Sequence, residues 1–283
     1  MKIPMGLFAA LAVFLLFDDP LMAEGLRGVA EKEVELEWAG QEIEVTLYVP
    51  EPFQDHFPSV VFLPGIMADV DQYQSYGRDL AKNGILVAVH PWYSLFTSDI
   101  ELANEARIIR DWMVATLRVD GDRVGIAGHS MGGKDAVLAQ GIHGGFGAVV
   151  AIDPDDSGEP SAVDLYAGQI RVPFLLIGAE LGWDAPDFCA PLEENYQRFY
   201  EASPPGTIEL TLIGADHVLM LEDPDRFGYN ICRAGWADPV KVRDTALKAT
   251  TAFFLQYLKD GPSALSALPV EAVRVKEPPA AKP

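Results

Sequence analysis

The sequence has little cysteine and little positive charge, and both shortages exclude classes of protein. Two cysteines among 283 residues are too few for a disulfide-rich scaffold, and no cluster of cysteine and histidine has metal-site spacing. The 21 lysines and arginines are outnumbered by 42 aspartates and glutamates, so the formal net charge is −21. Such a surface repels nucleic acid and anionic lipid, and we expect a neutral or apolar small molecule as the partner.

Long hydrophobic runs are also scarce, and the one at the N-terminus is too short to cross a bilayer. Lys2 precedes this apolar stretch, residues 6–17, and Ala23 precedes Glu24. The arrangement is typical of a secretory signal peptide over residues 1–23. We therefore expect a secreted or periplasmic protein with no stable membrane span in its mature form, a retained anchor being the alternative.

The two cysteines fit such a compartment. Oxidising conditions favour pairing when the number of thiols is even, so we expect a disulfide between Cys189 and Cys232. Two buried free thiols are the alternative, because sequence spacing does not establish that the two residues lie close together.

Strand and helix patterns alternate along the chain without an intervening linker. This alternation predicts the α/β class, with a mostly parallel eight-stranded sheet, helices on both faces and no large cap domain. We expect one domain over residues 24–260, followed by a flexible Pro/Ala-rich tail over 261–283. The expected strands are 34–38, 43–49, 59–63, 85–90, 124–127, 148–152, 174–177 and 207–212, and the expected longer helices are 72–83, 100–117, 131–140 and 240–258.

Residues 124–133, VGIAGHSMGG, combine a short apolar run with the pattern G-x-S-x-G at the expected strand-to-helix turn. This pattern is typical of a nucleophile elbow, whose sharp turn exposes the serine hydroxyl, and it makes Ser130 the candidate nucleophile. The elbow between a strand and a helix predicts an α/β-hydrolase fold, so we expect residues 24–260 to form a catalytic domain of that fold. The same glycines and Lys134 resemble the start of a phosphate-binding loop, but Asp135 stands where that loop needs serine or threonine. A chance glycine-rich turn with an idle serine is the other alternative.

A serine hydroxyl needs a base, and in this fold the base comes late in the chain, after the last strand. His217 is the histidine in that position and is the candidate base. We expect structural or solvated roles for the other histidines, which are His56, His90, His129 and His143.

The third catalytic group must be a carboxylate that orients the imidazole. Asp153 follows the expected strand 148–152 and Asp184 comes after the expected strand 174–177, and spacing alone favours neither strongly. The spacing of Asp153, Asp155 and Ser157 also imitates a calcium-binding loop, but a strand rather than a helix leads into it. We therefore expect neither a metal nor a cofactor.

An oxyanion hole requires two backbone N–H groups aimed at the developing charge. One comes from the residue after the nucleophile, here Met131, and the other from the loop after the third strand, here Ile66. Because the donors are backbone groups, both side chains remain free to shape contact with a substrate.

Several segments resemble the chlorophyllase family of α/β-hydrolases over about residues 57–261. Residues 128–134, GHSMGGK, resemble that family's GHSRGGK, and residues 151–156, AIDPDD, resemble its GIDPVD, whose aspartate is the family's triad acid. The segment CAP at 189–191 and HVLMLED at 217–223 are similar to the family's CAP segment and its HMDMLDD. The resemblance implies that Asp153 is the acid, with Asp184 as the alternative.

The residues and the resemblance together predict a serine carboxylic-ester hydrolase whose triad is Ser130, His217 and Asp153. We expect it to act as a monomer, and its expected substrate is an apolar ester such as the phytyl ester of chlorophyll or pheophytin. GHSMGG is equally typical of secreted general carboxylesterases, including cutinase-like and polyester hydrolases, and these are the alternative. A non-catalytic binding protein on a hydrolase scaffold is a remote alternative. Apolar side chains predicted to contact substrate, or otherwise to pack in the core, are Trp92, Phe96, Trp183 and Leu219.

Overall fold

The computed structural model describes residues 28–91, 97–184, 189–226, 228–262 and 273–276. The expected signal peptide, residues 1–23, lies outside the described residues, as do Trp92 and Phe96. Among the described residues, no helix combines the length and apolarity that crossing a membrane requires.

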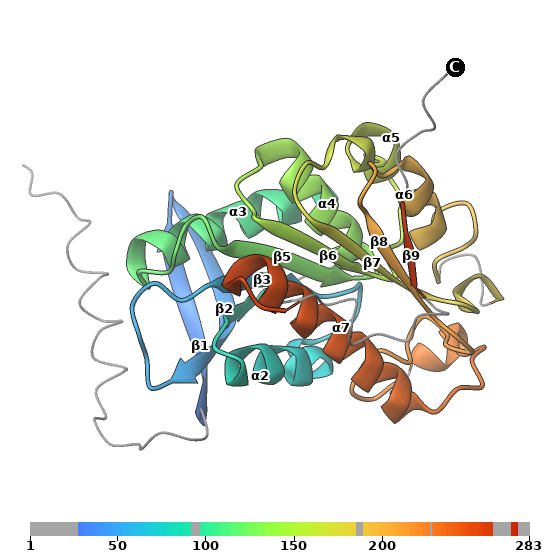
Figure 1. Ribbon diagram of the computed structural model, residues 1–283, viewed down its shortest axis with the longest axis horizontal. Coiled ribbons are helices and arrows are strands. Elements are labelled where there is room, and N and C mark those ends of the chain that lie inside the picture. Colours follow the sequence, from blue (N-terminus) through green and yellow to red (C-terminus); the bar gives the residue numbers. More distant parts are fainter. Residues whose placement is uncertain (1–27, 92–96, 185–188, 227, 263–272, 277–283) are drawn as a thin grey trace, which may run out of the picture.

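A nine-stranded sheet in the order β1-β2-β4-β3-β5-β6-β7-β8-β9 forms the centre of the described structure (Figure 1). Strands β3 to β8 run parallel, whereas β1, β2 and β9 are antiparallel to their neighbours at the two edges. The strands are β1 (Gly28–Trp38), β2 (Gln41–Glu51), β3 (Ser59–Leu63), β4 (Leu86–Val89), β5 (Val124–His129), β6 (Ala148–Ile152), β7 (Phe174–Ala179), β8 (Ile208–Leu212) and β9 (Val273–Val275).

Helices cover both faces of this sheet (Figure 1). On one face α2 and α7 pack with Phe62 and Val150 into one apolar core, and on the other α3, α4 and α6 pack with Val61 and Val149 into a second. The α-helices are α2 (Gln74–Lys82), α3 (Asp99–Thr116), α4 (Met131–His143), α5 (Ala162–Leu165), α6 (Tyr196–Ala202) and α7 (Pro239–Lys259), and the 3₁₀ helices are η2 (Val70–Tyr73), η3 (Ala167–Gln169), η4 (Gly182–Asp184) and η5 (Tyr229–Cys232).

Local signals in the sequence account for the N-terminal ends of the two longest helices, α3 and α7. Ser98 accepts a hydrogen bond from the Glu101 N–H, and the Glu101 side chain accepts one in return from the Ser98 backbone, so a capping box begins α3. At α7, the Asp238 side chain caps the first turn, and Pro239 occupies the first helical position, where its missing N–H carries no penalty.

The architecture confirms the predicted α/β-hydrolase fold, and all eight predicted strands and all four predicted longer helices are present. The chain between β6 and β7 holds only α5 and η3. The C-terminal segment differs from the prediction of a flexible tail, because Val273–Val275 adds a ninth strand to the edge of β8. The alternating Val-Arg-Val pattern suits an edge strand, and the Arg274 guanidinium pairs with the buried carboxylate of Glu209 on β8.

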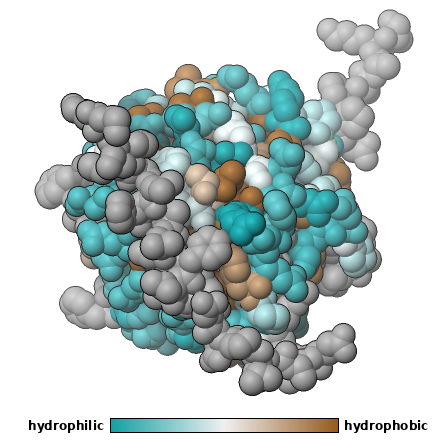
Figure 2. Space-filling view, turned by 90° about the vertical axis from the view of Figure 1, so that its left-hand side faces the viewer, coloured by the Kyte–Doolittle hydropathy of each residue, from teal (hydrophilic) through white to brown (hydrophobic). Residues whose placement is uncertain are grey.

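The surface is mostly polar on the face that Figure 2 presents. Hydrophilic residues predominate over the part of this face that is coloured by hydropathy, and hydrophobic residues form only small groups between them (Figure 2). This part of the surface therefore offers no broad apolar area to a partner.

Candidate active site

Ser130 occupies the sharp turn between β5 and α4. Its backbone has φ 58° and ψ −127°, a conformation that costs a non-glycine residue on the order of 1–3 kcal/mol and is typical of a nucleophile elbow. The turn is also crowded, because a Cβ on Gly132 would lie 2.3 Å from the Leu63 carbonyl oxygen. A Cβ on Gly128 would lie 2.1 Å from the Gly132 carbonyl oxygen. Only glycine fits at these two positions, which explains the G-x-S-x-G spacing.

His217 lies on the loop after β8, between Ser130 and Asp153. Its Nε2 is 2.9 Å from the Ser130 Oγ, and its Nδ1 is 2.7 Å from the Asp153 Oδ2. Since an ionised carboxylate can only accept, Nδ1 carries the hydrogen and the bare Nε2 accepts from the serine hydroxyl. The three side chains therefore form a continuous hydrogen-bonded chain in the order that serine acyl transfer requires.

Asp153 is held in place at the carboxyl end of β6. Its backbone has φ 40°, and its second carboxylate oxygen accepts a hydrogen bond from the Ala179 N–H at 2.9 Å. Asp184, the alternative acid, lies exposed on η4. Among the described residues, it makes no hydrogen bond with His217. The structure thus brings Asp153, and not Asp184, to the imidazole.

Burial and nearby charge act in opposite directions on the His217 imidazole. Burial disfavours the charged ring, but the hydrogen bond and the charge of Asp153 outweigh it, with help from Asp155 and Asp216, and the pKa of His217 is raised. The site therefore stabilises the charged imidazolium form of this ring, as a base that accepts a proton requires.

Asp216 supports the loop that carries His217, a role that the sequence reasoning missed. One of its carboxylate oxygens accepts hydrogen bonds from the N–H groups of Val218 and Leu219, and the other accepts from Ala234, Gly235 and the Arg233 side chain. Five donors on one buried carboxylate fix the turn at residues 216–219, which carries His217, against residues 233–235. An aspartate next to the candidate base was the signal in the sequence that could have indicated this role.

The two expected oxyanion donors belong to segments that lie beside Ser130. Met131 begins α4, where the first N–H groups of a helix have no intrahelical acceptor, and Ile66 follows Gly65 in the loop after β3. The loop approaches the nucleophile closely, because a Cβ on Gly65 would lie 3.0 Å from the Ser130 Cβ. Met131 is half-buried and Ile66 is exposed.

The predicted substrate contacts have different outcomes. Trp183 on η4 is 49% exposed and is therefore accessible to a ligand, whereas Leu219 is completely buried in the core. Leu219 therefore takes the core-packing alternative, because residues 218–221 are an apolar run that turns inward, where the Tyr76 hydroxyl donates to the Met220 carbonyl. Met67, which no sequence pattern singled out, is exposed next to Ile66.

The predicted disulfide between Cys189 and Cys232 is confirmed. The two Cα atoms are 5.6 Å apart, and the bond ties the segment after β7 to η5. Within the residues that the structure describes, no group of three or more histidine, cysteine, aspartate or glutamate side chains could hold a metal ion. In the calcium-like segment, the Asp155 carboxylate accepts hydrogen bonds from the Ser157 N–H and hydroxyl.

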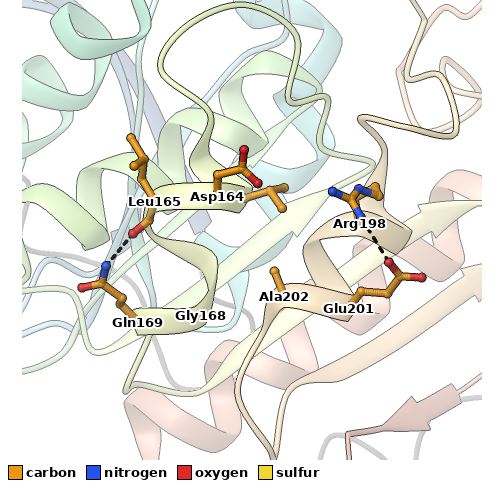
Figure 3. Close-up of a pocket in the computed structure, with 8 residues that line it drawn as sticks. Asp164, Leu165, Gly168, Gln169, Arg198, Glu201 and Ala202 are labelled. Atoms are coloured by element: carbon orange, nitrogen blue, oxygen red, sulfur yellow. Dashed lines mark hydrogen bonds and ion pairs between the residues drawn. The ribbon is translucent and has the colours of Figure 1, made fainter.

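A surface pocket of about 540 Å³ lies away from these residues, between the α5–η3 segment and α6 (Figure 3). Its wall includes an ion pair between Arg198 and Glu201 and a hydrogen bond from the Gln169 side chain to the Leu165 carbonyl. None of the expected site residues lines it. The pocket therefore contributes nothing to the arrangement around Ser130.

Comparison with known proteins identifies related sequences. A family model described as Chlorophyllase matches residues 20–277. Chlorophyllase type 0 of Chenopodium album is 24% identical over 196 residues, covering 59% of this chain and 56% of the relative. Chlorophyllase-1, chloroplastic, of Citrus unshiu is 26% identical over 162 residues, covering 51% of this chain and 49% of the relative.

The chain is also similar to an ester hydrolase with a different substrate in its name. Bis(hydroxyethyl) terephthalate hydrolase of Streptomyces coelicolor is 25% identical over 167 residues, covering 57% of this chain and 50% of the relative. The alignments thus span about half the length of these curated relatives. Because the family model covers most of the sequence and the fold agrees with it, the chain belongs to the chlorophyllase family.

Proposed function

We propose that the protein is a serine carboxylic-ester hydrolase. The observation that carries the proposal is the hydrogen-bonded chain from Ser130 through His217 to Asp153, with separations of 2.9 and 2.7 Å. In this mechanism the Ser130 Oγ attacks the ester carbonyl carbon while the His217 Nε2 takes its proton. The tetrahedral intermediate then expels the alcohol, to which the imidazolium returns the proton.

Water completes the cycle. His217 removes a proton from water as the water attacks the acyl-enzyme, and it then returns the proton to Ser130 as the carboxylic acid leaves. The backbone N–H groups of Met131 and Ile66 stabilise the oxyanion in both halves of the reaction. Losing one such donor typically costs about 3–4 kcal/mol of transition-state stabilisation.

The proposed substrate is an apolar ester of the chlorophyll or pheophytin type, whose hydrolysis gives chlorophyllide or pheophorbide and phytol. Membership of the chlorophyllase family supports this choice, and the exposed side chains of Ile66, Met67 and Trp183 offer apolar contact near the loops of the site. The likeness to a bis(hydroxyethyl) terephthalate hydrolase favours a second candidate, a general carboxylesterase that accepts aromatic or polyester substrates.

The test of ester hydrolysis is the Ser130→Ala variant, assayed on a p-nitrophenyl ester. We expect loss of turnover by several orders of magnitude with an unchanged circular dichroism spectrum. Ser59→Ala is the matched control, because Ser59 is equally buried on β3 and its hydroxyl has no hydrogen-bond partner among the described residues. Full activity in Ser130→Ala, or no esterase activity in the wild type, would overturn the proposal and favour a non-catalytic binding protein.

The substrate class is tested by comparing pheophytin, short and long p-nitrophenyl esters, and a polyester film, with Ser130→Ala as the blank. Release of pheophorbide with weak turnover of the simple esters supports the chlorophyllase-type substrate. The opposite order supports the general carboxylesterase.

We also propose that the protein is exported. The signal-peptide pattern over residues 1–23 and the disulfide between Cys189 and Cys232 support export to an oxidising compartment. Sequencing the N-terminus of the protein recovered from the extracellular or periplasmic fraction tests this, and an intact Met1 there would contradict cleavage.

A further inference from the structure

Two buried side chains that the reaction above does not use, Tyr73 and His129, join the loop after β3 to the loop after β8. The Tyr73 hydroxyl lies 2.9 Å from the Gly65 N and 3.0 Å from the His129 Nδ1. The His129 Nε2 lies 2.9 Å from the His217 carbonyl oxygen. Both side chains are almost completely buried, so these bonds do not compete with bulk water.

The direction of every hydrogen bond in this network follows from the chemistry of its members. The His217 carbonyl can only accept, so the His129 Nε2 carries a hydrogen. Burial lowers the pKa of His129 to about 3, with the charge of His217 as a smaller cause, so the ring is neutral and its Nδ1 accepts. The Tyr73 hydroxyl therefore donates to Nδ1, and its oxygen accepts from the Gly65 N–H.

The network contacts the segments that carry the proposed oxyanion donor and the proposed base. Gly65 directly precedes Ile66, the proposed oxyanion donor, and His217 is the proposed base. The packing is tight as well as hydrogen-bonded, because a Cβ on Gly65 would lie 3.1 Å from the His129 Nδ1 and 3.2 Å from the Tyr73 hydroxyl oxygen. The His129 and His217 rings also lie against each other, with centroids 4.9 Å apart.

We propose that Tyr73 and His129 are positioning residues that hold the oxyanion loop at Gly65–Ile66 and the backbone of His217 in a fixed relation to Ser130. The inference rests on the proposed function and deepens it, because it assigns roles to a residue inside the G-x-S-x-G motif and to one on η2. Neither side chain touches the reacting atoms. Each acts by directing a backbone group, and a displacement of the Ile66 N–H weakens its bond to the oxyanion.

Tyr73→Phe is the variant that tests this role, because it removes the hydroxyl and keeps the ring. We expect kcat to fall about 10- to 100-fold with little change in KM, since an oxyanion contact strengthens in the transition state. Tyr76→Phe is the matched control: Tyr76 is equally buried and contacts the same Phe62 ring, but its hydroxyl donates to the Met220 carbonyl instead.

A pair of substrates separates positioning from a general loss of structure. An ester and its thionoester differ only in the carbonyl atom, and sulfur accepts hydrogen bonds much more weakly than oxygen. If Tyr73 positions an oxyanion donor, Tyr73→Phe slows hydrolysis of the oxygen ester more than that of the thionoester. The kcat/KM of the oxygen ester divided by the kcat/KM of the thionoester therefore falls. Tyr76→Phe leaves that ratio unchanged.

Hydrogen exchange of the Gly65 amide is a second measurement that does not depend on catalysis. We expect its protection to drop in Tyr73→Phe and to persist in Tyr76→Phe. An unchanged substrate ratio together with unchanged Gly65 exchange in Tyr73→Phe would overturn the inference. If the wild type shows no hydrolysis that depends on Ser130, the proposed function fails and the positioning role fails with it. If the wild type is active but Tyr73→Phe and Tyr76→Phe have equal effects, only the positioning role is refuted.

Discussion

The Lys134 ammonium lies 2.6 Å from the Asp99 carboxylate in the interior of the protein. The Lys134 side chain is 0% exposed and that of Asp99 is 7% exposed. The same Nζ donates to the carbonyl oxygens of Ser157 and Gly158, at 2.6 and 3.2 Å. Lys134 on α4 therefore ties the start of α3 to the loop that follows Asp153.

Replacing Lys134 should destabilise the fold. Lys134→Met leaves Asp99 buried without its partner, and breaking such a pair typically costs about 3–5 kcal/mol in the free energy of unfolding. Urea denaturation of the wild type and the variant measures this loss. The double variant Lys134→Met with Asp99→Leu should recover much of it, because no unpaired charge remains. A loss below about 1 kcal/mol in the single variant would contradict the importance of the pair.

The choice between the two candidate acids can be decided by a pair of variants. Asp153→Asn should lower kcat by about four orders of magnitude, because the amide favours the wrong tautomer of His217 and does not stabilise the imidazolium. Asp184→Asn should leave kcat nearly unchanged, since Asp184 is exposed and is not bonded to His217. Steady-state kinetics on a p-nitrophenyl ester measures both, and the opposite ranking would transfer the role to Asp184.

The pH dependence of hydrolysis should report the raised pKa of His217. The imidazole must be neutral to act as a base, so kcat/KM falls as the pH drops through its pKa, which lies above the usual 6.5. Asp153→Asn replaces the charge and the charge-assisted hydrogen bond that raise this pKa with a neutral amide, so the acid limb should move to lower pH. A wild-type midpoint at or below 6.5 would contradict the raised pKa, and the absence of any acid limb would contradict the assignment of His217 as the base.

Removing the disulfide should lower stability without changing the sheet. The bond closes a segment with a sequence separation of 43 residues, and the double variant Cys189→Ser with Cys232→Ser should lose about 2–4 kcal/mol in the free energy of unfolding. Chemical denaturation of the variant, with the reduced wild type for comparison, measures the effect. Equal denaturation midpoints for the oxidised wild type and the double variant would show that the bond contributes little.

Much of the fold could be predicted because its signals are local. The strands 59–63 and 148–152 are short apolar runs, and α3 and α7 begin at residues that cap helices. The ninth strand could not be predicted in the same way, since residues 273–275 form a strand only because the edge of β8 and the buried Glu209 offer partners. Isolated three-residue patterns carry too little information to identify an edge strand.

The candidate site likewise contains residues that the sequence could identify and a residue that only the structure could assign. Ser130 and His217 follow from a motif and from chain order, because an elbow requires glycines at fixed positions and the base follows the last parallel strand. Asp153 and Asp184 both follow strands, and only the three-dimensional arrangement distinguishes them, since a carboxylate must come within hydrogen-bond distance of one particular nitrogen.

The sequence by itself determined the order of strands and helices, the elbow at Ser130 and the acidic, cysteine-poor composition, because each of these depends on neighbouring residues or on counts. Only the tertiary structure decided that Leu219 is buried, that Lys134 pairs with Asp99, and that Tyr73 meets His129. The two pairs join residues 35 and 56 positions apart in the chain, and their proximity is fixed by the packing of the sheet and its helices rather than by any local pattern.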